Sequence, residues 1–138
     1  ILLRHPRNDR KMIFAAMYLG NPSKKIPFMG VNNYVDEIIK LEKLFSDGRN
    51  FFYDTFSHVD INLMCVFNRL VDLGLEETVS HKTPFIHEYW EKLKSRNSYQ
   101  KGILNYYTDK EKKLLSEFYK NNDSSVLKAI LEQIDKKL

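Results

Sequence analysis

The sequence predicts an all-α protein, a bundle of about six to seven helices. Apolar residues recur at spacings of three and four along most of the chain, which is the period of a helix buried on one side. Only 5 glycines and 4 prolines interrupt the 138 residues, so long elements are expected. With 43% hydrophobic and 13% aromatic residues, the chain has enough apolar surface to bury a core and is not typical of disorder.

The first helix is expected to start at Asn8 or Asp9, either of which can act as its N-cap. It ends at Gly20-Asn21-Pro22, after an apolar series at helical spacing: Met12, Ile13, Ala16, Met17 and Leu19. Residues 23–27 are predicted as a loop, because Ser, Lys and two flanking prolines oppose regular structure. An amphipathic helix follows over residues 31–45, and Gly48 provides its stop signal.

The central helix is predicted to begin at Ser57 and to end at Gly74. It follows residues 50–55, whose Phe and Tyr side chains suit a connecting loop packed against the core. Apolar residues on nearly all sides of this helix predict that it is buried, and Cys65 within it is expected to be a small core residue.

Four further elements are predicted towards the C-terminus. Pro84 suits the first turn of a helix that directs apolar residues inward: Phe85, Ile86, Tyr89, Trp90 and Leu93. A short helix over residues 98–106 follows, then one from Asp109 and a last one from Ser124 or Ser125. The lysines at positions 110, 112, 113, 136 and 137 are expected on solvated helix faces.

The stretch FSHVDINL holds Ser57 and Asp60 three residues apart, which is the spacing of a helix capping box. Ser57 would accept a hydrogen bond from the Asp60 N–H, and Asp60 would reach back to the Ser57 N–H. Phe56 and Ile61 occupy the two positions of a hydrophobic staple. The alternative is a catalytic set of Ser57, His58 and Asp60. Such sets are assembled from distant segments, so we favour the structural role and expect no catalytic residue in this chain.

Charge and cysteine content exclude several classes. The net charge of +4 is spread along the chain without a compact basic block, so no nucleic-acid partner is expected. A single cysteine and four histidines without ligand spacing predict neither a disulfide nor a metal site. No window reaches the roughly 18 apolar residues of a membrane span, and no signal peptide is recognised, which favours a soluble, reduced, cytoplasmic setting.

The run FSHVDINLMCVFNRLVDLGL, followed by TPFIHEYWEKLKSRNSYQKGI, resembles the C-terminal helical domain of the glutathione S-transferase superfamily. That family carries a Ser/Thr-x-x-Asp box with a staple at its central helix, then a proline and an aromatic-rich helix. Those positions are Ser57, Asp60, Pro84 and Trp90 here, and residues 5–11 resemble the family's linker into this domain. The resemblance extends to about residue 102, beyond which the tail is longer than in minimal members. Residue 53, where the family often has Gly, is Tyr.

The resemblance implies that residues 1–138 form one helical domain, the C-terminal half of a longer protein. Glutathione and the catalytic residue would belong to an absent thioredoxin-like N-terminal domain. The helical domain would form the wall of a pocket for a small hydrophobic electrophile, with wall residues on the first helix: Met12, Ala15, Ala16, Tyr18 and Leu19. A core role for those residues stays open. The resemblance also implies a homodimer.

Two functions remain open at this point. The chain is either the helical half of a glutathione transferase or a non-catalytic transferase-like scaffold that binds partners. The segment Asn68–Gly74 resembles the ganglioside-induced differentiation-associated and dehalogenase-like branches of the superfamily. If the first of these branches is the right one, association with the mitochondrial membrane is expected.

Overall fold

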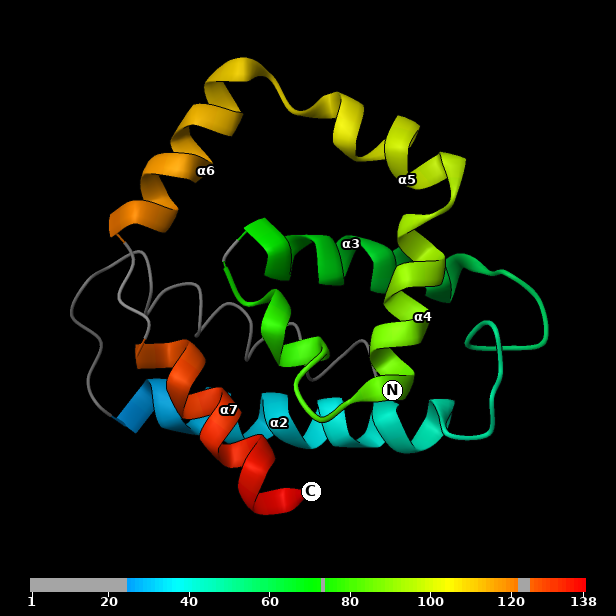
Figure 1. The fold of residues 1–138 in the computed structure, drawn as a ribbon, viewed down its shortest axis with the longest axis vertical. Helices are drawn as coiled ribbons and strands as arrows, with labels where there is room; N and C mark the ends of the chain where they lie inside the picture. Colours follow the sequence, from blue (N-terminus) through cyan, green and yellow to red (C-terminus); the bar gives the residue numbers. More distant parts are fainter. Residues whose placement is uncertain (1–24, 73, 122–124) are drawn as a thin grey trace. The chain divides into compact units, whose positions relative to one another are not determined.

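A computed structural model describes residues 25–72, 74–121 and 125–138. Every regular element in these segments is a helix, which confirms the all-α prediction (Figure 1). The chain divides into two compact units, one formed by Ile1–Leu41 with Asn122–Leu138 and the other by Glu42–Asn121. None of the described helices combines the length and the apolar character that crossing a membrane requires.

The first unit pairs most of helix α2 (Lys25–Phe45) with α7 (Ser125–Lys137), which lies across it (Figure 1). Ile130 and Ile134 of α7 are fully buried, and Val35 of α2 is also inaccessible to solvent. An ion pair joins the two helices, with Lys137 Nζ at 2.6 Å from Asp36 Oδ1. Helix α7 starts at Ser125, as the sequence predicted. It buries one apolar stripe along its length.

The start of α2 differs from the prediction. The helix begins at Lys25, so the expected loop over residues 23–27 is wrong from that residue onward. Pro27 lies in the first turn, where a missing N–H breaks no intrahelical hydrogen bond. The end of α2 at Phe45 is as predicted, and Gly48 follows with a φ of +80°.

The second unit contains the remaining elements in chain order: α3 (His58–Asp72), the 3₁₀ helix η1 (Glu76–Val79), α4 (Pro84–Lys94), α5 (Asn97–Gly102), the 3₁₀ helix η2 (Leu104–Tyr106) and α6 (Asp109–Asn121). Helix α4 packs against α3 (Figure 1). Trp90 is at the centre of this unit, with the rings of Phe67 and Tyr99 each at 5.5 Å in edge-to-face geometry. Tyr89 stacks on Phe45 at 4.0 Å. These aromatic pairs supply much of the buried apolar surface.

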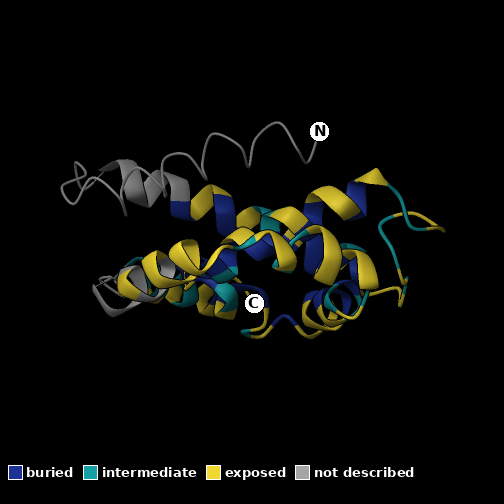
Figure 2. Cartoon of the chain, turned by 90° about the horizontal axis from the view of Figure 1, so that it is seen from above, coloured by how far each residue is buried: buried dark blue, intermediate teal, exposed yellow. Residues whose placement is uncertain are grey.

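Two burial predictions are wrong. Cys65 is exposed rather than buried, and Ile61 on the same helix is 50% exposed, so α3 has a solvent-facing side. Buried and exposed residues alternate along the helices in this way elsewhere in the chain (Figure 2). Phe85 is 41% exposed rather than inward. The buried stripe of α4 follows the spacing of Ile86, Tyr89, Trp90 and Leu93, and Phe85 is about 100° around the helix from the start of that stripe.

Helix η1 was not expected from its polar sequence. Its first residue, Glu76, accepts a hydrogen bond from the indole N–H of Trp90 at 2.9 Å and one from Lys94 Nζ at 3.1 Å. Burial by itself raises the pKa of Glu76, but these two donors outweigh it and lower the pKa below its usual value. The connector is thus held to α4 by a charged, partly buried contact.

Candidate functional site

The start of α3 has Ser57 as its N-cap. Asp60 Oδ2 accepts hydrogen bonds from the Ser57 backbone N–H at 2.8 Å and from the Ser57 hydroxyl at 3.1 Å. The Ser57 hydroxyl oxygen accepts from the Val59 N–H at 3.3 Å, and not from the Asp60 N–H that the sequence suggested. The Asp60 carboxylate therefore reaches back to Ser57 as in a capping box. The Ser57 hydroxyl accepts from the N–H of Val59, one residue before the expected donor.

Asp60 also ties two other segments to the helix start. It is fully buried, and its Oδ1 accepts from the Phe52 N–H at 2.9 Å and from the Tyr89 hydroxyl at 2.7 Å. Burial by itself raises the pKa of Asp60, but the hydrogen bonds from Tyr89, Phe52 and Ser57 outweigh it and lower the pKa. Burial and the Asp60 carboxylate together raise the pKa of Tyr89 far above its ordinary value, so this phenol remains a donor.

These contacts favour the structural role over the catalytic one for Ser57, His58 and Asp60. Both oxygens of the carboxylate accept hydrogen bonds, from two backbone N–H groups and two hydroxyls, and His58 is exposed to solvent. A nucleophile and base of a hydrolytic set would instead open onto a shared cleft. The cluster is built as a structural anchor that joins a loop and α4 to the start of α3.

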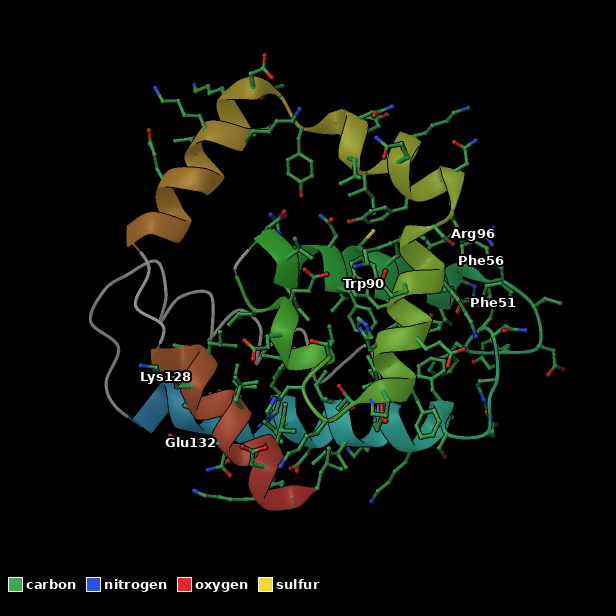
Figure 3. All side chains as sticks on the ribbon, viewed as in Figure 1. Phe51, Phe56, Trp90, Arg96, Lys128 and Glu132 are labelled. Carbon is green, nitrogen blue, oxygen red and sulfur yellow. The ribbon has the colours of Figure 1, made fainter. Side chains whose placement is uncertain are left out.

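Phe56 packs beside an arginine. The guanidinium carbon of Arg96 lies 3.6 Å from the centroid of the Phe56 ring and 5.7 Å from that of Phe51 (Figure 3). Such cation–π contacts attach the aromatic loop to the start of α5. Ile61, the other staple position, is half exposed. A packing contact between Phe56 and Ile61 therefore stays a prediction.

The start of α4 is capped from a distant segment. Glu42, at the end of α2, accepts from the Phe85 N–H at 3.2 Å and from the Ile86 N–H at 2.9 Å. A carboxylate at a helix N-terminus is favourable because the free amides and the helix dipole both stabilise it. Thr83, the adjacent N-cap residue, makes no side-chain capping bond, and its fully buried hydroxyl lacks a hydrogen-bond partner.

A pocket of about 320 Å³ opens beside the C-terminal half of α3. We call it the α3–α6 pocket. One wall comes from α3 through Cys65, Asn68, Arg69 and Asp72. The other wall comes from the segment leading into α6 through Gly102, Ile103, Tyr106, Tyr107 and Glu111. The α3 residues share one face because they lie three, four and seven positions apart. The volume is within the range of small-molecule sites.

Hydrogen bonds across the pocket fix its two walls together. Tyr107 donates its hydroxyl to Asp72 at 2.6–2.7 Å and accepts from Asn68 Nδ2 at 2.7 Å. Asn68 Oδ1 accepts from the Tyr99 hydroxyl at 2.8 Å, and Arg69 pairs with Asp72 at 3.1 Å. Burial and the Asp72 hydrogen bond raise the pKa of Tyr107 to about 12, so it is protonated at neutral pH.

The start of α6 is a second capping box. Thr108 Oγ1 accepts from the Glu111 N–H at 3.2 Å, and Glu111 Oε2 accepts from the Thr108 N–H at 2.7 Å and its hydroxyl at 2.9 Å. The backbone and hydroxyl bonds from Thr108 lower the pKa of Glu111. This motif was missed, although the Thr-x-x-Glu spacing was readable in the sequence.

The residues predicted to form an electrophile wall are not described by the structure. All five wall residues taken from the resemblance fall outside the described residues: Met12, Ala15, Ala16, Tyr18 and Leu19. Cys65 lines the α3–α6 pocket, which the sequence did not suggest. Across the described part of the chain, no group of three His, Cys, Asp or Glu side chains is arranged to hold a metal ion.

No local pattern in the sequence indicated the long-range contacts of the site. Tyr107 and Asp72 are 35 positions apart, and Glu42 and Ile86 are 44 apart.

No protein-family model matches this chain, and no curated protein or solved structure is significantly similar to it.

Proposed function

We propose that this chain is the helical half of a glutathione transferase-like protein and that it supplies a binding wall rather than reacting groups. The observation that carries the proposal is the set of hydrogen bonds that the Asp60 carboxylate accepts at the start of α3. Its two oxygens accept from Ser57, Phe52 and Tyr89, which is a structural use of the Ser-x-x-Asp pattern. The all-α fold of the described residues supports the same assignment.

The chemistry of the described side chains agrees with a supporting role. The carboxylates of Asp60 and Asp72 and the hydroxyls of Tyr89 and Tyr107 are all engaged in hydrogen bonds within the protein. In the proposed protein, glutathione is a substrate held by a thioredoxin-like N-terminal domain. Its thiolate attacks the electrophilic carbon, and the leaving group departs with the electron pair of the broken bond. The helical half orients the electrophile and excludes water.

The first test uses the full-length protein. It should be retained on immobilised glutathione and should conjugate 1-chloro-2,4-dinitrobenzene with release of chloride. Under the proposal, Ala16→Trp reduces the space that the pocket offers to the electrophile. It therefore raises KM for the chlorobenzene and leaves retention on glutathione unchanged. Ser98→Trp places the same side chain at an exposed position of α5 and serves as the control. An equal KM in both variants would remove Ala16 from the wall.

The second candidate is a non-catalytic transferase-like module that binds a partner or a second copy of itself. It is favoured by the exposed side of α3, where Ile61 is 50% exposed and Cys65 is also exposed. Full-length protein that neither binds immobilised glutathione nor turns over the chlorobenzene would support this module. Sedimentation of Ile61→Glu against His58→Glu, its exposed neighbour on α3, would then test for self-association through this face.

A further inference from the structure

We propose that the α3–α6 pocket binds a small organic cation, an ammonium group carried on a compact apolar body. Its lining includes none of the residues proposed for the electrophile wall, and the inference does not depend on the transferase function. The inference rests on the charge of the lining, on its aromatic rings and on the way its one cationic side chain is already used.

The lining is acidic in a basic protein. The lining holds two carboxylates, Asp72 and Glu111, and one guanidinium, Arg69, which gives it a formal net charge of −1. The whole chain carries +4. A cation entering the pocket therefore meets a local field opposite in sign to the average surface, whereas an anion would add a third negative charge.

The guanidinium is not placed as an anion receptor. Arg69 Nη1 pairs with Asp72 Oδ2 at 3.1 Å, and the Asp72 side chain is only 8% exposed. An anionic ligand would have to compete with that carboxylate for the same donors. Glu111 differs from Asp72 in that both of its hydrogen bonds, from Thr108, fall on Oε2. Among the described contacts, its Oε1 is left to accept from a ligand.

Aromatic side chains provide the second element that an ammonium group requires. Tyr106, which is 79% exposed, and Tyr107 both line the pocket. The negative face of an aromatic ring attracts a cation, and aromatic cages are a general solution for binding quaternary ammonium groups. Ile103 and Cys65 add apolar surface for the body of the ligand.

Three probes with the same ring test the charge preference: benzyltrimethylammonium, benzyl alcohol and benzoate. Ligand-observed NMR titration of the full-length protein should give saturable binding for the cation and much weaker binding for the other two. Slower alkylation of Cys65 by iodoacetamide in the presence of the cation, measured by peptide mass spectrometry, places it in this pocket. Equal binding of benzyl alcohol or benzoate would overturn the proposal, as would unprotected Cys65.

Two pairs of variants separate the binding groups from folding effects. Tyr106→Ala should weaken binding about two- to fivefold, while Tyr106→Phe keeps the ring and should bind normally. Glu111→Gln keeps a capping side chain but loses the charge, and should weaken binding by up to about fivefold. Glu117→Gln, an exposed acid farther along α6, is its control. Unchanged affinity in Tyr106→Ala and Glu111→Gln, with normal melting, would also overturn the proposal.

Discussion

The Tyr89 hydroxyl donates to Asp60 Oδ1 at 2.7 Å and so connects the middle of α4 to the start of α3, 29 positions away. Asp60→Ala should lower the free energy of unfolding by about 3–5 kcal/mol, because it leaves the buried Tyr89 hydroxyl and the partly buried donors of Phe52 and Ser57 without their acceptor. Chemical denaturation measures this loss. Asp54→Ala, an exposed acid in the preceding loop, should change stability by less than about 0.5 kcal/mol.

The stability contributed by Asp60 should depend on acid pH. Its folded pKa is below the ordinary value of 3.8, so the unfolded chain binds the proton first. The contribution is complete above about pH 5 and is lost as the pH falls through the folded value. Wild type should therefore lose more stability than Asp60→Asn between about pH 5 and about pH 3, as measured by urea midpoints. Parallel losses in the two proteins would show that other carboxylates control acid unfolding.

The substitution Thr→Val should have opposite effects on the stability of the protein at two buried threonines. Thr83→Val removes a hydroxyl that has no hydrogen-bond partner and should stabilise the protein by about 1 kcal/mol. Thr78→Val removes a hydroxyl that donates to the Leu75 carbonyl at 2.7 Å and should destabilise it by about 1 kcal/mol. Thermal melting of the two variants side by side makes the comparison. Destabilisation by Thr83→Val would indicate that its hydroxyl has a partner in solution, such as a bound water.

Gly48 should be intolerant of a side chain for a backbone reason alone. Its φ of +80° disfavours any residue with a Cβ, although no atom would lie within 4 Å of that Cβ. Gly48→Ala should therefore cost about 1–2 kcal/mol in a melting experiment. Gly102→Ala is the control, because that glycine is helical and its surroundings are equally open. A neutral Gly48→Ala would mean that the turn can adopt another conformation at little cost.

Tyr107 should control how firmly the segment leading into α6 is held. Tyr107→Phe removes the donor to Asp72 and the acceptor of Asn68, at an expected cost of about 1.5–3 kcal/mol. Amide exchange over residues 102–114 should accelerate. Tyr106→Phe, in the neighbouring exposed ring, should leave exchange unchanged. Equal exchange in the two variants would show that other contacts hold this segment.

Local patterns in the sequence predicted most of the described helices. The apolar spacing of residues 31–45, the proline at position 84 and the pattern from Asp109 identify α2, α4 and α6, because each is encoded within a few turns. The glycine stops after α2 and α3 were also readable, and both glycines have positive φ.

The features that the sequence did not predict depend on tertiary contacts. Whether Cys65 is buried is decided by what packs on that side of α3, which periodicity in one helix does not specify. The partners of Asp60 and Asp72 come from segments far along the chain, so the pocket and its hydrogen bonds could not be derived from the sequence. The Thr108–Glu111 box was local and detectable, and its omission was avoidable.

The burial of Trp90 has a practical consequence for studying this protein. Trp90 is the single tryptophan of the 138 residues, is only 1% exposed and belongs to the Glu42–Asn121 unit. In this chain, the intrinsic indole emission is therefore a spectroscopic signal from that unit alone. Loss of structure confined to α7 and the first part of α2 would leave the emission maximum unchanged while ellipticity at 222 nm declines. A denaturation series followed with both signals would therefore reveal whether the chain melts in one step or two.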